Sequence, residues 1–299
     1  MKKKFQGTGV ALVTPFHKYG AIDFDSIAKV VEHTIKNGVD YLVVLGTTGE
    51  APTLSKDDKI AVTDFVIETV NGRVPIVKGV GGNNTQEVVN YLKSGSFEGI
   101  DAILSVCPYY NKPKQKGIYY HYKTIASISP VPVILYNVPG RSGANINAET
   151  TLQLARNFDN IIAIKEASGN FVQVMEILKN KPEDFMVISG DDALTLPLMA
   201  LGVEGVISVV ANAFPAEFSK MVNLCLDGKF EGAKQIHFGL IDIINTLFED
   251  GSPGGIKAAL HILGLCQNNL RLPVVKVNKS VNMKLNNLIS EYKPTKSKR

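Results

Sequence analysis

The chain has 299 residues, of which 45% are hydrophobic and 20% are charged, which is enough apolar material for a large globular core. Its net charge of +4 is too small to indicate a nucleic acid or a membrane surface as a partner. The three cysteines are widely spaced and the five histidines show no paired spacing, so neither a disulfide framework nor a metal site is indicated. No run is long and apolar enough to span a bilayer, and we expect a cytoplasmic protein.

Short apolar runs rich in β-branched residues alternate along the chain with longer amphipathic segments. The first amphipathic segment begins at Asp25 and Ser26 and runs to Lys36, and Ser55 begins the second. Both begin with residue types that cap helix N-termini, so both predict helices. The predicted strands are, in chain order, GVALVTP, DYLVVLG, PIVKGV, AILSVCP, PVILYNVP, IIAIKEA, FMVISG and GVISVV.

This alternation of strand and helix has no composition break, and it predicts βαβ units and a parallel sheet. A doubly wound open sheet and a closed barrel both fit, but a count of about eight repeats favours the barrel. No GxGxxG motif follows the first strand, which weakens the dinucleotide-binding alternative. We therefore predict an α/β fold, a (β/α)8 TIM barrel that carries the catalytic site over residues 1–228. A C-terminal helical region, residues 229–299, is expected to pack on it.

Polar residues gather where the predicted strands end, which is where the chemistry of a (β/α)8 barrel lies. The second strand ends in GTTGE, the fifth ends at Tyr136, and the sixth ends at Lys165. Burying an ammonium group is unfavourable unless it is paired or loses its proton, so a lysine at the end of a core strand requires a reason. Strand alternation places Ile161, Ala163 and Lys165 on one face, with the small Ala163 leaving room beneath the lysine.

A lysine in this place has a chemical use. Burial favours the neutral amine, which attacks a carbonyl carbon and forms a Schiff base. The protonated imine withdraws electrons, so the adjacent carbon can lose a proton and become an enamine, as in an aldolase. A hydroxyl group is needed nearby to move protons, and Tyr136, Thr47 and Tyr110 are the candidates.

The residues alone leave two questions open about this lysine. Lys165 could serve only as the ion-pair partner of Glu166 or of a loop carboxylate. In addition, PIVKGV places a second lysine, Lys78, at the end of an apolar strand. Spacing alone does not choose between Lys78 and Lys165.

The segments GTTGE, PYYNKP, YNVPGRSG, IKEASGN and SGDD, in this order and spacing, resemble the dihydrodipicolinate synthase family. This family belongs to the pyruvate-dependent class I aldolases, together with the N-acetylneuraminate lyases. The resemblance extends from about GTGVALVTPF to GVISVVAN and more weakly to the C-terminus. It implies a (β/α)8 barrel, a homotetramer built from tight dimers, and no metal or organic cofactor. The implied reaction condenses pyruvate with L-aspartate 4-semialdehyde in diaminopimelate and lysine biosynthesis.

The resemblance also implies roles for catalytic residues. It places the Schiff base on Lys165, so Lys78 is expected to be structural. It gives proton transfer to Tyr136, with Thr47 and Tyr110 completing a relay. Tyr110 is expected to reach into the site of the neighbouring subunit.

Four further residues are implied to bind substrate. Thr48, with backbone groups of GTTG, holds the pyruvate carboxylate, and Ile207 lies against pyruvate through its backbone. Arg141 binds the carboxylate of the second substrate, a task that suits a planar guanidinium. Gly190, in SGDD, belongs to the same substrate site and allows a tight turn.

Two alternatives to this reaction remain. A sibling enzyme acting on a sugar acid, of the N-acetylneuraminate lyase type, shares most of these motifs. Such relatives tend to lack an arginine that matches Arg141, so its presence favours the synthase. The other alternative is a catalytically silent barrel used as a binding protein, which loss of Lys165 or Tyr136 would signal, and neither is lost.

The chain departs from the family pattern at two places. Ser252 stands where many members carry asparagine, near the start of a late helix. The second place is the site at which some members bind inhibitory lysine. Asn83, Glu87 and Tyr109 match that site, whereas Ala51, Lys56 and Lys59 differ from the inhibited type, which favours histidines at the last two positions. Extra positive charge repels a cationic ligand, so we predict weak or no inhibition by lysine.

Overall fold

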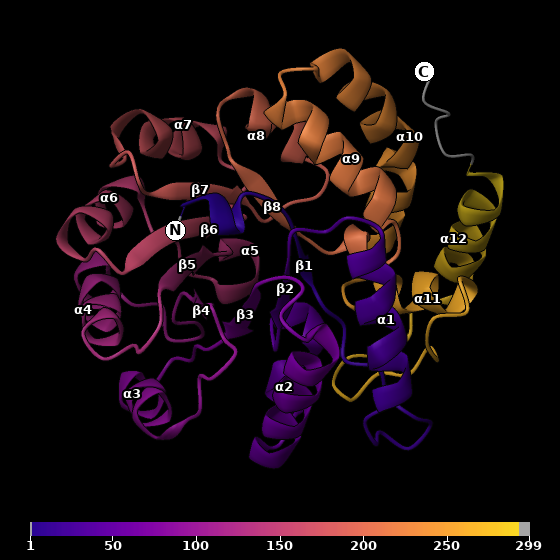
Figure 1. Cartoon of the computed structure of the whole chain (residues 1–299), viewed down its shortest axis with the longest axis horizontal. Coiled ribbons are helices and arrows are strands. Elements are labelled where there is room, and N and C mark those ends of the chain that lie inside the picture. Colours follow the sequence, from indigo (N-terminus) through magenta and orange to yellow (C-terminus); the bar gives the residue numbers. More distant parts are fainter. Residues whose placement is uncertain (1, 293–299) are drawn as a thin grey trace.

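The computed structural model describes residues 2–292, and within them eight parallel strands close into a barrel (Figure 1). The strands follow one another around the barrel in chain order, and the last pairs with the first. They are β1 (Gly7–Ala11), β2 (Tyr41–Val44), β3 (Ile76–Gly79), β4 (Ala102–Val106), β5 (Val133–Asn137), β6 (Ile161–Glu166), β7 (Met186–Ser189) and β8 (Gly205–Ser208). Seven predicted strand segments contain one strand each, and the first overlaps β1, which begins two residues earlier than predicted. The predicted TIM barrel is therefore confirmed.

Helices connect successive strands and surround the barrel (Figure 1). They are α1 (Phe24–Lys36), α2 (Lys56–Val70), α3 (Thr85–Ser94), α4 (Gln115–Ala126), α5 (Pro139–Ser142), α6 (Ala148–Asn157), α7 (Phe171–Asn180), α8 (Thr195–Ala200) and α9 (Pro215–Leu226). After them come α10 (Phe230–Glu249), α11 (Gly254–Ile262) and α12 (Lys279–Glu291). Short 3-10 turns are η1 (Lys2–Phe5), η2 (Thr47–Gly49), η3 (Ala51–Thr53) and η4 (Val210–Asn212).

The two predicted helix starts differ in accuracy. Ser55 caps α2 as expected, and its side chain and that of Asp58 form a reciprocal capping box. Helix α1 begins earlier than predicted, because Asp23 rather than Asp25 is the cap and accepts a hydrogen bond from the backbone of Ser26. Either aspartate suits the cap by type, so composition alone did not separate them.

All eight strands contribute side chains to the barrel interior, which is filled rather than hollow. The interior side chains include Ala11, Tyr41, Val43, Val77, Ala102, Leu104, Ile134, Tyr136, Ile162, Ala163, Met186, Ile188 and Ile207. Gly9 makes room for one of them, since a Cβ there would lie 2.2 Å from the Tyr41 ring. Phe5, just before β1, packs on Tyr41 with ring centres 5.6 Å apart, which closes the N-terminal end of the barrel.

An irregularity in β6 changes which of its residues face inward. The pairing with β5 shifts by one residue, so that Val133 lies opposite Ile161 and Ile134 lies opposite Ala163. Ile162 and Ala163 both join the interior, while Ile161 packs outward among the helices. The prediction that Ile161 shares a face with Lys165 is therefore wrong, because an extra residue interrupts the alternation.

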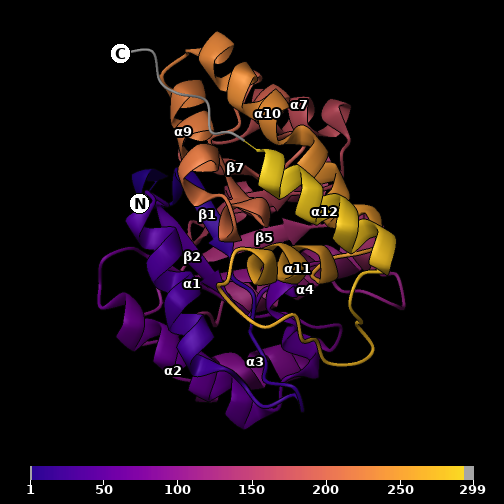
Figure 2. The same cartoon turned by 90° about the vertical axis from the view of Figure 1, so that its right-hand side faces the viewer.

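The C-terminal helices share a hydrophobic cluster with the helices that surround the barrel. Leu240 of α10, Leu260 of α11 and Leu285 of α12 are fully buried in the same cluster as Val30 of α1. Figure 2 turns toward the viewer the side on which α11 and α12 lie. Among residues 2–292, no helix has the length and apolar character needed to cross a membrane.

Candidate active site

Lys165 and Tyr136 meet inside the barrel, near the C-terminal ends of neighbouring strands. They lie opposite each other in the pairing of β5 with β6. Lys165 is 4% exposed, and its Nζ lies 4.4 Å from the centre of the Tyr136 ring. A cation over an aromatic face is a favourable contact, and here it also places an amine beside a phenol. The sequence-based pairing of these two residues is thus found in space.

Gly190 lies directly against the stem of Lys165. A Cβ at position 190 would come within 2.9 Å of Lys165 Cε and 2.7 Å of Ala167 Cβ. The backbone N–H of Gly190 donates to the Glu166 carbonyl at 2.8 Å, which holds the two strand ends together. A larger residue here would displace the lysine, so the position requires glycine.

Lys78, the competing lysine, lies on the other side of the barrel wall. Its neighbour Val77 faces the interior, so Lys78 faces the surrounding helices. Its Nζ lies 5.3 Å from the ring centre of Tyr91 on α3 and 5.5 Å from that of Phe97. The structure therefore separates the two lysines that spacing left equivalent.

Glu166 does not serve as the ion-pair partner of Lys165. It lies on the opposite face of β6, where its carboxylate accepts hydrogen bonds from Asn137 Nδ2 at 3.1 and 3.2 Å and from Gln173 Nε2 at 2.9 Å. The backbone N–H of Ser168 donates to it at 2.8 Å. Within the part of the chain that the structure describes, no ion pair with a carboxylate is found for Lys165. A buried carboxylate held by neutral donors instead supports the strand from behind.

The same network reaches the loop after β5. Asn137 Nδ2 donates to Asn145 Oδ1 at 2.7 Å, and Asn145 Nδ2 donates to Gln173 Oε1 at 2.8 Å. The Asn137 side chain also accepts from the backbone of Ile146 at 2.9 Å. Because Asn137 follows Tyr136 and Glu166 follows Lys165, this network fixes the ends of both strands. Sequence reasoning missed it, although the amides in YNVPGRSGAN were a signal.

The GTTGE segment forms the 3-10 turn η2 after β2. Thr48 is 5% exposed, whereas Thr47 is exposed to solvent. Leu45 and Glu50 have φ values of 58° and 53°, so the turn enters and leaves through left-handed backbone. The side chain of Thr14, after β1, donates to the Gly49 carbonyl at 2.7 Å and ties this turn to the adjacent loop.

Asp192, in SGDD, connects the loops after β7 and β8. Its Oδ2 accepts from the backbone N–H groups of Val209 and Val210, each at 3.0 Å. Burial raises the pKa of Asp192 to about 6, and hydrogen bonds from the Ser208 side chain and these backbone groups partly oppose the rise. The aspartate therefore fixes the loop that follows Ile207.

The remaining predicted residues lie at different depths. Ile207 is 1% exposed and belongs to the same interior cluster as Tyr136. Arg141 lies on α5 after β5 and is exposed. Tyr110 is 87% exposed with a φ of 75°, and it is not packed into the interior of its own chain.

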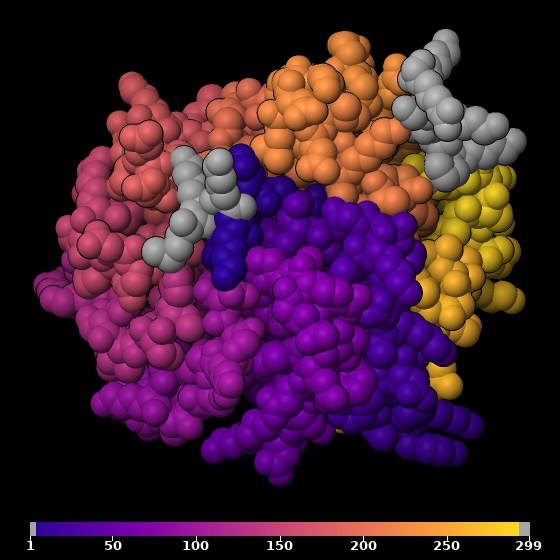
Figure 3. Space-filling model, viewed as in Figure 1, coloured from indigo at the N-terminus to yellow at the C-terminus, as the bar shows by residue number. Residues whose placement is uncertain are grey.

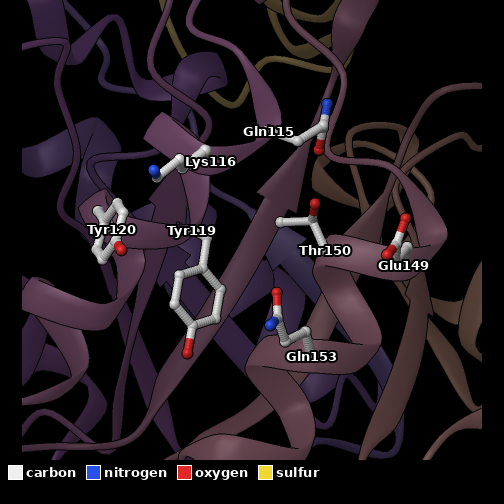
Figure 4. A pocket seen from close by; sticks show the side chains of 7 residues that line it. All are labelled: Gln115, Lys116, Tyr119, Tyr120, Glu149, Thr150 and Gln153. Carbon is white, nitrogen blue, oxygen red and sulfur yellow. The ribbon is translucent and has the colours of Figure 1, made fainter.

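A surface groove between α4 and α6 lies outside the barrel and contains none of the predicted site residues (Figure 4). Its volume is about 310 Å³, and α4 and α6 line opposite sides of it. The lining residues are Gln115, Lys116, Tyr119, Tyr120, Glu149, Thr150 and Gln153. Gln115 also donates to the Asn145 carbonyl at 2.7 Å, so the groove wall touches the amide network. Residues 2–292 hold no group of three or more histidine, cysteine or acidic side chains placed to bind a metal.

The model of the Dihydrodipicolinate synthetase family matches residues 4–292 of the chain. The chain belongs to this family. The resemblance seen in the motifs is thereby confirmed, and as a member of a family of lyase-type synthases the chain is an enzyme.

Individual members of the family are similar over nearly the whole chain. The 4-hydroxy-tetrahydrodipicolinate synthase of Parabacteroides distasonis is 56% identical over 270 residues, which cover 90% of this chain and 91% of that protein. The solved dihydrodipicolinate synthase from Aquifex aeolicus has a TM-score of 0.93 at 40% identity and covers 96% of this chain and 98% of its own. The enzyme from Cyanidioschyzon merolae, solved with lysine bound, has a TM-score of 0.92 at 39% identity, with coverages of 96% and 97%.

Proposed function

We propose that the chain condenses pyruvate with L-aspartate 4-semialdehyde, and that Lys165 forms a Schiff base with pyruvate as the first step. The proposal rests on the meeting of Lys165 and Tyr136 inside the barrel, where Nζ lies 4.4 Å from the ring centre. An aldolase of this type needs an amine that forms the Schiff base and a hydroxyl group that transfers protons. A buried amine beside a phenol, at the C-terminal ends of barrel strands, provides both. The names of the relatives support the choice of substrates and a step in diaminopimelate and lysine biosynthesis.

The reaction follows from the chemistry of a neutral amine. Lys165 Nζ attacks the C2 carbonyl of pyruvate, and loss of water leaves a C=N bond between them. The iminium withdraws electrons, so C3 loses a proton through the Tyr136 hydroxyl and becomes an enamine carbon. This carbon attacks the aldehyde carbon of the second substrate, whose oxygen takes up a proton. The amino group of that substrate then adds to C2 and displaces Lys165, which closes the ring and frees the lysine.

Other residues are proposed to bind and orient the substrates. Thr48 and the backbone of its turn hold the pyruvate carboxylate, and Ile207 borders pyruvate through its backbone. Thr47 and Tyr110 extend the proton relay from Tyr136. Arg141 binds the carboxylate of the aldehyde substrate, for which its exposed position at the end of β5 leaves access. Gly190 is assigned to the substrate site because it borders the lysine stem.

The proposed assembly is a homotetramer of tight dimers. Tyr110 supports this arrangement, because an aromatic side chain that is 87% exposed on its own chain is available to a neighbouring subunit. The proposed domain division assigns the site to residues 1–228 and a supporting helical region to residues 229–299. The biosynthetic names of the relatives support a cytoplasmic location.

The test is reductive trapping with borohydride in the presence of pyruvate, followed by peptide mass mapping. The expected result is a reduced pyruvate adduct on Lys165, absent from Lys165→Met and retained in the matched control Lys78→Met. An adduct on Lys78, or no adduct, would overturn the proposal. Assays with aspartate semialdehyde and with sugar acids then identify the second substrate, and activity with a sugar acid alone would favour a lyase of the N-acetylneuraminate type.

A further inference from the structure

A fully buried ion pair joins the turn after β2 to the C-terminal helices. Glu50 follows η2 directly, and its Oε1 accepts a hydrogen bond from Lys257 Nζ of α11. Both side chains are at most 1% exposed, and the two residues are 207 positions apart in the chain. A buried pair of this kind adds little stability over apolar packing of the same volume, so its presence requires another reason.

The C-terminal region holds both oxygens of the Glu50 carboxylate. The backbone N–H of Arg271 donates to Oε2 at 3.0 Å, while Lys257 Nζ also donates to the Asn269 carbonyl at 2.9 Å. The ring of Phe16, after β1, receives both cations, with Lys257 Nζ 4.1 Å and Arg271 Cζ 4.6 Å from its centre. The Glu50 carboxylate is thus fixed by residues that lie beyond the barrel in sequence.

Arg271 also binds the segment after the turn and the loop that follows β1. Its Nη1 donates to the Thr53 carbonyl at 2.9 Å and to Asp58 Oδ2 at 2.7 Å, and its Nε donates to the Gly20 carbonyl at 2.9 Å. The guanidinium beside Asp58 lowers the pKa of that carboxyl group. Figure 3 shows the C-terminal segment in yellow beside the N-terminal segment in indigo at the right edge of the molecule.

The backbone between Thr47 and Glu50 is also held in place by hydrogen bonds and close contacts. The backbone N–H of Glu50 donates to the Thr47 carbonyl at 3.1 Å, and Glu50 has a φ of 53°. The preceding Gly49 is held by Thr14, and a Cβ on it would lie 3.2 Å from a carbonyl of the β1 loop. A shift of the Glu50 carboxylate would therefore move Thr48, which is two residues away.

We propose that the C-terminal region positions the Thr47–Thr48 turn for the carboxylate of the first substrate, through the buried pair of Glu50 and Lys257. The inference rests on the proposed function, in which Thr48 and its turn bind the pyruvate carboxylate. Glu50 and Lys257 are positioning residues, because they act through the turn and do not touch the substrate. The appended helices then do more than stabilise the barrel, since they set the affinity of the site for pyruvate.

The test compares pyruvate saturation between variants of the full-length enzyme. Removing Glu50 alone leaves a buried cation and strongly destabilises the fold, so the main variant is the double change Glu50→Gln with Lys257→Met, which removes both charges. The readout is the pyruvate concentration that gives half-maximal borohydride inactivation. We expect it to rise about tenfold, because a small displacement of a binding group lowers affinity steeply. The KM for the aldehyde substrate should stay unchanged.

Two further variants keep the result interpretable. Lys284→Met removes a pair with Glu249 that joins α12 to α10 away from the turn, and it should leave pyruvate saturation unchanged. If the double variant does not fold, Arg271→Met decides the question, with an expected rise of about threefold. If the folded double variant shows wild-type pyruvate saturation, the inference is overturned, and the proposed function is not. If the double variant does not fold, wild-type saturation in Arg271→Met has the same meaning. Absence of any adduct on the wild-type enzyme would overturn the proposed function and the inference with it.

Discussion

Lys78 and Lys165 occupy the same kind of position in two strands of one barrel, yet their surroundings differ. Each lies near the C-terminal end of an apolar strand, and each is 4% exposed. Lys165 points into the barrel and meets a phenol ring, Tyr136, whereas Lys78 points outward between two aromatic rings of the helical layer. Burial and residue type are equal, and only the face of the strand differs.

The difference shows what turns a buried lysine into a candidate nucleophile. An outward-facing lysine is enclosed by side chains of the surrounding helices, which leave a substrate no access. An inward-facing lysine near the C-terminal end lies at the mouth of the barrel, where loops of every strand meet. The face of the strand on which a lysine lies therefore decides whether its side chain packs among the helices or is available for catalysis.

The largest expected effect breaks the comparison directly. Lys165→Met should reduce kcat by about 10⁴-fold or more, because methionine has no amine to form the Schiff base. Lys78→Met should leave kcat within about threefold of wild type, because methionine keeps the apolar stem and its contacts with the two rings. Steady-state assays of both variants check this, and equal losses would show that the two lysines are not functionally distinct.

The partner of Lys165 comes next in size. Tyr136→Phe retains the ring beside Lys165 Nζ but loses the hydroxyl group, so kcat should fall by about 10²–10³-fold. Borohydride trapping of pyruvate on Lys165 should still occur in this variant. A variant that keeps wild-type kcat would remove Tyr136 from the proton relay.

The amide network behind Lys165 distinguishes its strand from that of Lys78. Glu166→Gln places an amide where three donors, from Asn137, Ser168 and Gln173, point toward a carboxylate. Leaving a buried donor unpaired should lower the free energy of unfolding by about 1–3 kcal/mol. Denaturant unfolding measures the loss, and the same change at the exposed Glu68 of α2, Glu68→Gln, provides the control. An unchanged midpoint for Glu166→Gln would mean that water or a rotated amide satisfies the network.

Asp192 extends the comparison to a buried acid. Its pKa is raised by burial to about 6 from an ordinary value of 3.8, so the folded state favours the protonated form. The protonated Asp192 side chain stabilises the folded state. This contribution to the free energy of unfolding is fully present below about pH 4 and is lost as the pH rises through about 6. Asp192→Asn removes that loss, so its stability relative to wild type should increase by about 2–3 kcal/mol between these pH values. Unfolding curves that stay parallel across this range would contradict the assignment.

The smallest effect concerns two lysines on α2 that are not buried, the exposed Lys56 and the half-buried Lys59. The resemblance to the family predicts that these two positions border the site for inhibitory lysine, where their side chains would add positive charge. We expect weak or no inhibition by low millimolar lysine, and increased inhibition in the double variant Lys56→His with Lys59→His. Strong inhibition of the wild-type enzyme in a steady-state assay would show that Asn83, Glu87 and Tyr109 suffice for binding.

The sequence by itself determined the order and type of the barrel elements. Apolar runs such as DYLVVLG and PVILYNVP have the composition of strands buried on both faces, and their regular alternation with amphipathic segments allows few architectures. The polar residues at the strand ends could also be located, because a strand that ends in Lys165 or Tyr136 breaks its own apolar pattern. These properties depend on residues that are neighbours in the chain, so they can be predicted from the sequence.

Tertiary structure decided the features that depend on register and on distant contacts. The extra residue in β6 reversed the expected direction of Ile161, and the face of Lys78 could be assigned only once Val77 was placed in the interior. The contact between Glu50 and Lys257 spans 207 positions, and no periodicity connects two residues so far apart. Such contacts arise when the closed barrel brings its loops together at one end, and they decide which buried polar group finds a partner.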